Sequence, residues 1–170
     1  MLRHQSNCCV RVELGTDERI RAFLTALIHL VRNKRMIKKT VLAIGIEPSF
    51  ADFGAFPHLT PELIGHFIEA QIERLRALGY DAYSCLIDLG ETAEAVTMAA
   101  LRSKHPDCVV IGAGLREPAE RLLLFEKIIN LVLIHAPHAR ICFNTTPADT
   151  AEAVQRWIKP SAVRVPRSAP

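Results

Sequence analysis

The feature that most constrains this chain is a set of four short apolar runs, each followed by a segment in which apolar residues have helical spacing. The runs cover residues 40–46, 82–88, 107–112 and 139–144. They are rich in β-branched residues and almost continuously apolar, which is typical of strands buried on both faces of a parallel sheet. Strands that alternate with helices predict an α/β domain with helices on both faces.

Local signals place the helices between these strands. The helical patterns run over residues 61–78, 91–104, 118–135 and 147–158. Thr60-Pro61 and Thr146-Pro147 each put a capping hydroxyl before a proline that fits the first helical position. Because crossovers between parallel strands are right-handed, the economical topology is a doubly wound three-layer sandwich. We predict a parallel sheet of four strands in the order 2-1-3-4, which is flavodoxin-like.

Composition agrees with a single globular domain. The chain has 170 residues, of which 49% are hydrophobic and 23% charged, and this excludes disorder, collagen and coiled coil as its main state. No apolar run is long enough for a membrane-spanning helix, and the first residues lack the apolar core of a secretory signal. The five cysteines form no C-x-x-C pair. We therefore expect a reducing compartment and a cytoplasmic protein.

Charge separates the two flanks from the centre. Residues 1–36 carry seven basic and three acidic groups, residues 37–158 carry 11 and 15, and residues 159–170 carry three and none. Because the centre is mildly acidic, we expect no nucleic-acid partner. Acidic residues at the start of the N-terminal apolar pattern also disfavour a membrane surface.

These divisions predict a domain over residues 37–158 and a disordered tail over residues 159–170. The first 36 residues leave three interpretations open. A strand over residues 9–14 could add a fifth strand, or Thr16 could begin an amphipathic helix that docks on the domain or on a second subunit. The stretch Met36-Ile-Lys-Lys directly precedes the first strand of the domain, so the segment could also come from a mis-assigned start.

Ligands of open parallel sheets bind at the carboxyl ends of the strands, where the strand order reverses. In the predicted order this point lies between the first and third strands, so the loops after them should face each other. The first loop, residues 47–59, is long and carries Glu47, Ser49 and Asp52 among three phenylalanines. One interpretation is a lid in which Glu47 or Asp52 is a catalytic base and Ser49 binds the ligand. The other is a loop whose phenylalanines simply cover helix ends.

The second loop has the sequence Gly112-Ala-Gly-Leu-Arg-Glu117. Gly112 and Gly114 allow the backbone to approach a ligand closely, and Arg116 can hold an anion with two parallel hydrogen bonds. The alternative is a tight turn between a strand and a helix. In both interpretations, this loop and residues 47–59 are predicted to be neighbours across the opening of one site at the carboxyl edge of the sheet.

Two further strand ends complete the predicted ligand-binding rim, at Asp88 and Asn144. Capping the following helix is the simpler role for Asp88. Glu117 stands where a dinucleotide fingerprint needs its third glycine, so the sequence favours no dinucleotide and leaves the cofactor unknown. His135 and His138 fall at a helix end on the opposite edge, and without zinc spacing we predict no metal.

The helical segment from Leu122 to Ile134 is apolar nearly all round, although a helix that covers a sheet needs only one apolar stripe. Leu124, Leu131 and Ile134 are expected to point outward. Such a stripe predicts a subunit interface, and therefore a homo-oligomer such as a homodimer. Cover by the N-terminal helix is the alternative.

Four strings carry a family resemblance: VLAIGIEP from Val41, VVIGAG from Val109, LLLFEK from Leu122 and ICFNT from Ile141. They resemble an uncharacterised family of small flavodoxin-like α/β proteins from bacteria and fungi. The resemblance covers residues 37–158 and implies the doubly wound fold. No established activity comes with the family, so no residue role is carried over.

These observations predict a protein that binds a small anionic molecule at the carboxyl edge of a parallel sheet, and they leave open whether it is an enzyme. The alternative is a non-catalytic regulatory or protein-interaction module that acts through the apolar helix.

Overall fold

The computed structural model describes residues 20–21, 38–50 and 58–161 of the chain. Contacts divide the chain into two units, residues 1–35 and residues 36–170, and the second unit holds the whole sheet. The predicted N-terminal strand and most of the predicted C-terminal tail lie outside the described residues.

A four-stranded parallel sheet forms the centre of the domain. Its strands are β1 (Thr40–Ile46), β2 (Asp81–Ile87), β3 (Cys108–Ile111) and β4 (Arg140–Phe143). Their order is β2-β1-β3-β4, and all three neighbouring pairs are parallel. The predicted strand order and the flavodoxin-like α/β fold are thereby confirmed.

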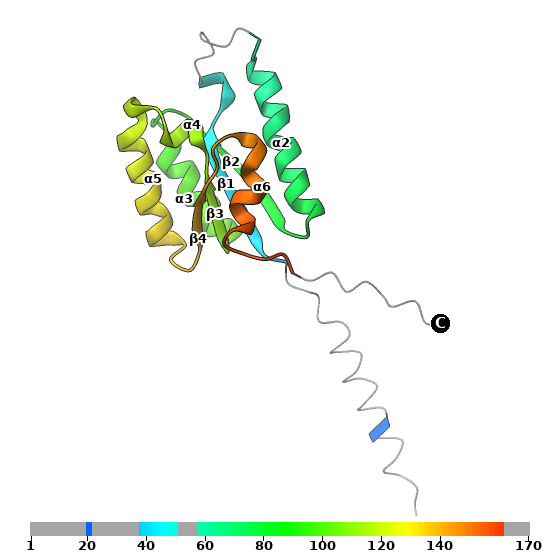
Figure 1. Ribbon diagram of the computed structural model, residues 1–170. Helices are drawn as coiled ribbons and strands as arrows, with labels where there is room; N and C mark the ends of the chain where they lie inside the picture. Colours follow the sequence, from blue (N-terminus) through cyan, green and yellow to red (C-terminus); the bar gives the residue numbers. More distant parts are fainter. Residues whose placement is uncertain (1–19, 22–37, 51–57, 162–170) are drawn as a thin grey trace, which may run out of the picture. The chain divides into compact units, whose positions relative to one another are not determined.

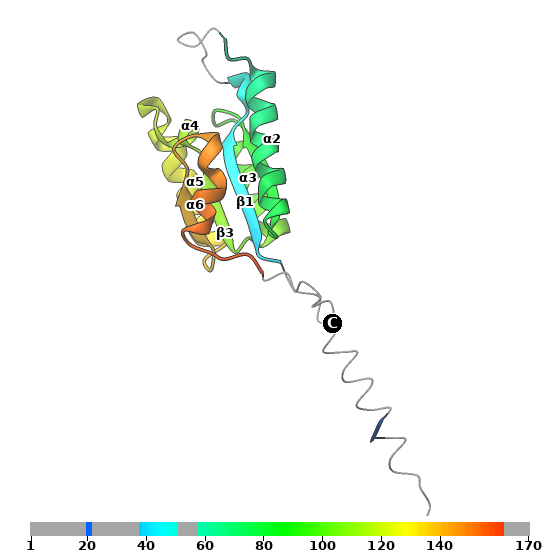
Figure 2. The ribbon, with the colours of Figure 1, turned by 45° about the vertical axis from the view of Figure 1, so that its right-hand side comes forward.

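Helices cover both faces of this sheet (Figures 1 and 2). They are α2 (Pro61–Ala77), α3 (Ala93–Lys104), the short α4 (Ala113–Arg116), α5 (Leu122–His135) and α6 (Thr150–Gln155). Buried residues of α2 and α6 share one core with the sheet, and those of α3, α4 and α5 share another. The sheet therefore separates two cores in the predicted three-layer sandwich.

The expected capping signals set the start and end of α2. The Thr60 hydroxyl oxygen accepts a hydrogen bond from the Leu63 backbone N–H at 3.2 Å, and Pro61 occupies the first helical position. Gly79 follows the helix with a φ of 96°, a left-handed conformation that glycine adopts without strain. These contacts fix where the chain turns at each end of the helix.

The connections after β3 and β4 differ from the expected pattern. The glycine loop after β3 continues into α4, because Leu115 finds a fully buried place in the core beneath α3 and α5. The next helix begins at Leu122 rather than residue 118, after a 3-10 turn, η2 (Ala119–Arg121). In the same way, a 3-10 turn, η3 (Pro147–Asp149), precedes α6.

The orientation of α5 corrects one expectation. Leu124 was predicted to point outward, but it is only 7% exposed, and Leu131 is half-buried. The cause is the neighbouring helix α3, since the Lys127 ammonium on this side of α5 pairs with the Glu94 carboxylate of α3 at 2.6 Å. Ile134 is 68% exposed, as expected.

Side chains on the α2 face of the sheet become smaller toward the carboxyl ends of two neighbouring strands. Because successive side chains alternate between the two faces, β1 presents Val41, Ala43 and then Gly45 toward α2. β3 is likewise followed by Gly112, after larger residues in the strand. The layer between α2 and the sheet is therefore well filled at its amino end and hollow at its carboxyl end.

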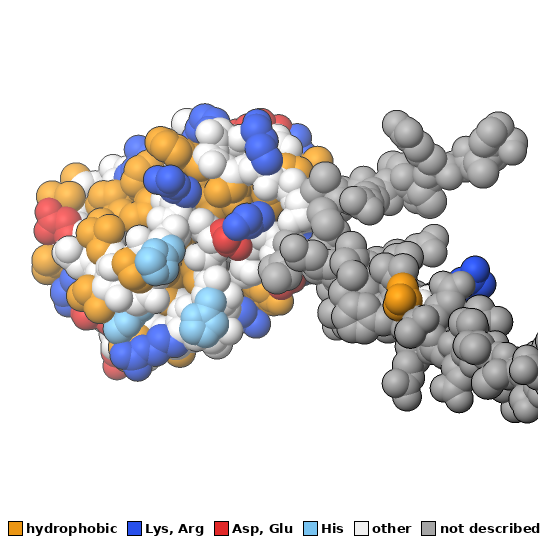
Figure 3. All heavy atoms as spheres, turned by 90° about the horizontal axis from the view of Figure 1, so that it is seen from below, with side chains coloured by type: hydrophobic (Ala, Val, Ile, Leu, Met, Phe, Trp, Pro, Cys, Tyr) orange, Lys and Arg blue, Asp and Glu red, His pale blue; other side chains and the backbone are white. Residues whose placement is uncertain are grey.

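The opposite, amino edge of the sheet is rich in basic groups. Figure 3 views the molecule from this edge and shows Lys, Arg and His side chains spread over it among apolar ones, with fewer acidic side chains. The Lys39 ammonium pairs there with the Asp107 carboxylate at 2.7 Å. Both ends of the described domain, at residues 38 and 161, leave from this edge (Figure 1). The chain therefore attaches its two basic flanks at the edge opposite the predicted site.

The hydroxyl of one buried tyrosine links the segment before β2 to the C-terminal end of the domain, and its removal should weaken the fold. Tyr80 is fully buried and donates a hydrogen bond to the Ile158 carbonyl oxygen at 2.8 Å. We expect Tyr80→Phe to lower the free energy of unfolding by about 1 kcal/mol, because the Ile158 carbonyl loses its donor. Urea unfolding measures this change.

The matched control is Tyr83→Phe, because the Tyr83 hydroxyl bonds only the Asp81 carboxylate at the partly exposed sheet edge. It should change the free energy of unfolding by less than about 0.5 kcal/mol. Equal effects of the two variants would show that the Tyr80 bond does not hold the C-terminal segment.

Candidate functional site

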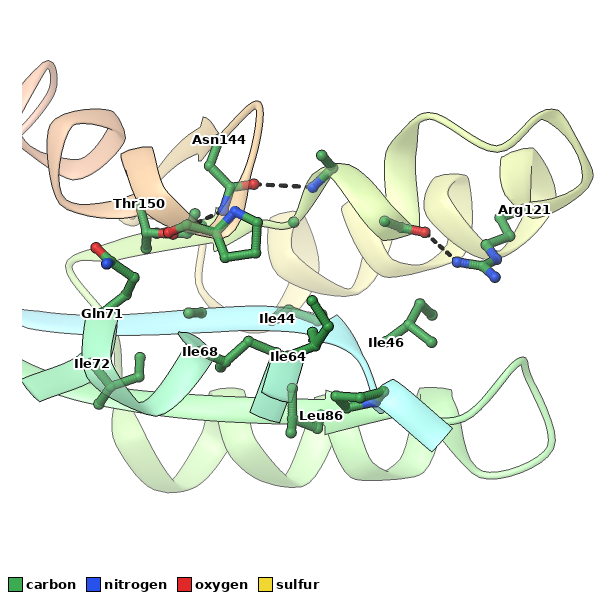
Figure 4. Close-up of a pocket in the computed structure, with 18 residues that line it drawn as sticks. Ile44, Ile46, Ile64, Ile68, Gln71, Ile72, Leu86, Arg121, Asn144 and Thr150 are labelled. Atoms are coloured by element: carbon green, nitrogen blue, oxygen red, sulfur yellow. Dashed lines mark hydrogen bonds between the residues drawn. The ribbon is translucent and has the colours of Figure 1, made fainter. Parts of the chain in front are cut away.

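A cavity of about 250 Å³ occupies the hollow between α2 and the carboxyl ends of β1 and β3. One wall is an apolar stripe on α2 formed by Ile64, Ile68 and Ile72, which lie four residues apart and point toward the sheet (Figure 4). Gly45 and Leu86 contribute to the opposite wall. The cavity is therefore an apolar space at the carboxyl edge of the sheet.

The cavity lies at the point where the strand order reverses. Pro48, which follows β1, lines it together with Gly112, Ala113 and Gly114, which follow β3. The two segments predicted to meet across one mouth are thus neighbours in the structure. This is the place where ligands bind in open parallel sheets.

Asn144 supports the far wall of the cavity by joining three elements. It is 6% exposed, and its amide oxygen accepts a hydrogen bond from the Ala113 backbone N–H at 3.0 Å. Its amide nitrogen donates to the Thr150 hydroxyl at 2.8 Å, and that hydroxyl donates to the Pro147 carbonyl at 2.7 Å. Both polar ends of the Asn144 side chain are therefore used within the protein.

Arg121 is the one charged residue among the described residues that line the cavity. It ends η2, and its guanidinium donates a hydrogen bond to the Gly114 carbonyl oxygen (Figure 4). No carboxylate of the described residues pairs with it. Its remaining donors are thus available at one end of an otherwise apolar space.

The structure brings some of the predicted site residues to the cavity and leaves others away from it. Gly112, Gly114 and Asn144 line the cavity. Glu47, Ser49, Asp88 and Arg116 are not among the lining residues. Asp52 lies outside the described residues. The ligand-binding and catalytic roles of all eight stay predictions.

Arg116 points toward β4 instead of the cavity. Its guanidinium lies 5.8 Å from the centre of the Phe143 ring and donates to the Asn144 carbonyl oxygen at 3.3 Å. It also pairs with the neighbouring Glu117 carboxylate at 2.9 Å. These contacts give Arg116 a packing role, whichever ligand the protein binds.

Backbone amides around the glycine loop are mostly engaged. The Gly112 N–H donates to the Ile44 carbonyl oxygen at 2.9 Å, and the Ala113 N–H is bound by Asn144. A Cβ on Gly112 would lie 3.4 Å from that same Ile44 oxygen. Gly112 thus serves the close approach of β1 and β3, and Arg121 is the better placed group for an anion.

Asp88 adopts the capping role that the sequence left open. Its carboxylate accepts hydrogen bonds from the backbone N–H groups of Gly90, Thr92 and Ala93, at 2.8 to 3.0 Å, and from the Thr92 hydroxyl. The backbone bonds, led by that from Gly90, hold the pKa of the Asp88 carboxyl below its ordinary value. The carboxylate therefore fixes the start of α3.

Two of the three described cysteines, Cys85 and Cys108, lack the low thiol pKa of a nucleophile. Burial raises the pKa of the Cys85 thiol to about 11. Cys108 and Cys142 are buried with their sulfur atoms 3.6 Å apart, and the shared thiol hydrogen bond together with burial raises the pKa of Cys108. Cys85 and Cys108 are thus neutral thiols at physiological pH, whereas the hydrogen bond with Cys108 lowers the pKa of Cys142.

The described ranges hold neither a cluster of metal ligands nor a membrane-spanning helix. No three histidines, cysteines or carboxylates there are grouped so that they could hold a metal ion. None of the helices in the same ranges is both long enough and apolar enough to cross a membrane.

Comparisons with protein-family models, curated proteins and solved structures gave no match for this chain. The resemblance to a flavodoxin-like family therefore stays a prediction. The fold itself rests on the strand order and the helix layers described above.

Sequence reasoning missed the residues that give the cavity its chemistry. Ile64 and Ile68 were recognised only as part of an apolar helix face, and Arg121 was not singled out. One signal was available for the cavity, because Gly45 near the end of β1 and Gly112 directly after β3 lie on the face that α2 covers. No comparable signal separated Arg121 from Arg116, since both follow the same strand within a few residues.

The Asn144 contacts predict a large loss of stability when they are removed. We expect Asn144→Ala to lower the free energy of unfolding by about 2–3 kcal/mol, because two hydrogen bonds are lost and the Ala113 N–H is left without a partner. Asn130→Ala is the control, since the Asn130 amide bonds only the Glu126 carbonyl of its own helix. Similar urea midpoints for the two variants would contradict the role of Asn144.

The Asp88 contacts predict a pH-dependent contribution to stability. Because folding lowers the pKa of this carboxyl, the carboxylate stabilises the fold above its ordinary pKa, and the contribution disappears as the pH falls through the folded value. Wild type should therefore be more stable than Asp88→Asn at neutral pH, and the difference should shrink below about pH 4.

Urea unfolding between neutral and acidic pH measures this difference. Glu91→Gln is the control, because the exposed Glu91 carboxylate makes no hydrogen bond to the start of α3. A gap between wild type and Asp88→Asn that stays constant down to the acid limit of folding would argue against the proposed contribution.

Proposed function

We propose that this protein binds a small molecule with an apolar body and one anionic group in the cavity beneath α2. The observation that carries the proposal is the charge pattern of the cavity, whose lining is apolar apart from four polar residues among those that the structure describes. Arg121 is the only one of these with a formal charge. An apolar space with one cation at its end favours a ligand of matching polarity.

The size of the cavity supports a small ligand. Its volume of about 250 Å³ lies just below the roughly 300–1,000 Å³ of pockets that hold drug-sized molecules. A short aliphatic or single-ring carboxylate fits this description better than a nucleotide does. Bidentate pairing with a carboxylate is also the geometry that a guanidinium favours.

The lining supports binding rather than catalysis. None of the described residues that line the cavity is a carboxylate, histidine, cysteine or serine. The one hydroxyl, that of Thr150, is engaged with Asn144 and Pro147. The proposal therefore assigns no reacting group, and Glu47 and Asp52 stay predicted bases.

Binding can be tested with carboxylates and neutral amides of equal size. We expect hexanoate to bind about tenfold or more tightly than hexanamide, because only the carboxylate forms charge-assisted hydrogen bonds with Arg121. Isothermal titration and thermal shift measure both ligands. In Arg121→Gln the preference for hexanoate should disappear, whereas Arg102→Gln, which removes an exposed charge from α3, should keep it.

A second variant tests the cavity independently of charge. A Cβ on Gly45 would lie 3.8 Å from the nearest Leu86 atom, so the strand accepts a side chain there. Gly45→Val should fill the apolar space and abolish binding of both probes while the protein still unfolds cooperatively. Binding that survives Gly45→Val, or that is lost only in Arg116→Gln, would place the ligand elsewhere.

A further inference from the structure

An apolar surface lies on the side of α5 that faces away from the core. It carries four large apolar residues that are more than half exposed: Leu122 (57%), Leu123 (66%), Leu133 (56%) and Ile134 (68%). Two exposed polar residues lie between them. We call the set the α5 face; its members are Leu122, Leu123, Glu126, Asn130, Leu133 and Ile134.

The α5 face is nearly symmetric about the position of Ile128. Leu122 and Ile134 are equally far from that position, and so are Leu123 and Leu133. The polar residues are also symmetric, since Glu126 lies two positions before Ile128 and Asn130 lies two positions after it. When two such helices pack antiparallel across a two-fold axis, each residue meets the one at the mirrored position.

We propose that the α5 face binds a second copy of this chain, with the two α5 helices antiparallel and the two-fold axis opposite Ile128. Leucine and isoleucine then meet at both ends of the contact. At its centre, each Glu126 carboxylate meets Asn130 of the partner subunit. The two Glu126 carboxylates are thereby kept apart along the helices, and each of them faces an Asn130 amide that can donate a hydrogen bond.

The Asn130 amide is suited to this contact. One of its N–H groups donates to the Glu126 carbonyl oxygen of its own helix at 2.9 Å. A side-chain amide has a second N–H, which can donate to a carboxylate. Two such bonds, related by symmetry, would satisfy the polar centre of an otherwise apolar interface.

Self-complementarity is the reason for proposing a second copy rather than a different protein. A different partner needs only an apolar surface, and it places no symmetry requirement on the helix. The neighbouring Lys127 is paired with Glu94 of α3, so it adds no unpaired charge to the α5 face. The 14 residues of α5 span only about 21 Å, which limits the contact area. We therefore expect a weak, concentration-dependent dimer.

Sedimentation of the full chain from micromolar to millimolar concentration tests the proposal. Wild type should shift from monomer to dimer over this range. Leu123→Glu should raise the dissociation constant at least about tenfold, because each dimer would bury two carboxylates against leucine. The matched control is Leu89→Glu, at a loop leucine that is 52% exposed and lies outside the α5 face. It should leave the dissociation constant unchanged.

Cysteine cross-linking tests the orientation. Under mild oxidation, the double variant Leu123→Cys/Leu133→Cys should form a disulfide-linked dimer, because the proposed packing places each new thiol beside its mirror position on the partner. Either single variant should cross-link no more than wild type. Positions 123 and 133 are about 15 Å apart along the helix, beyond the reach of a disulfide.

Three results would overturn the proposal. Wild type could remain monomeric at millimolar concentration, which includes the case where another part of the same chain covers the α5 face. Leu123→Glu and Leu89→Glu could weaken self-association equally. The single cysteine variants could cross-link as well as the double variant, which would exclude the antiparallel arrangement.

Discussion

The hollow in this domain depends on one packing constraint, which is the loss of side-chain volume at the carboxyl ends of β1 and β3. Gly45 and Gly112 stand side by side beneath α2, at the point where the strand order reverses. The helix cannot close the gap because its later turns pack through Ile72 and Leu75 against larger side chains of the sheet, such as Val41. The Gly112 N–H donates to the Ile44 carbonyl, which keeps the two strand ends paired despite the missing side chains.

A hollow at a strand end is useful only when its walls are fixed. Asn144 fixes one wall of the cavity by joining the end of β4 to the starts of α4 and α6. Asp88 fixes the start of α3 in a similar way, with a carboxylate that accepts several backbone hydrogen bonds. Both residues were predicted as ligand contacts because they end strands. The structure shows that polar residues at strand ends also organise the loops around a site.

The fold could be predicted from the sequence because its signals are local and mutually consistent. The four apolar runs became four parallel strands, and the Thr60-Pro61 and Thr146-Pro147 pairs began helical segments where expected. The location of the cavity also followed, because topology alone brings the loops after β1 and β3 together. The sequence did not predict which face of α5 is buried, since that face is set by the contact between Lys127 and Glu94, which are far apart in the chain.

The distinction between Arg116 and Arg121 shows why site residues are harder to predict than site location. Both arginines follow β3, but α4 turns the first toward Phe143 and η2 returns the second to the Gly114 carbonyl. Arg121 also directly precedes Leu122, the first residue of the α5 face. The proposed ligand and a second copy of the chain would therefore contact adjacent residues on one turn. Thermodynamic linkage then requires that any effect of the ligand on self-association be matched by an equal effect of self-association on the ligand.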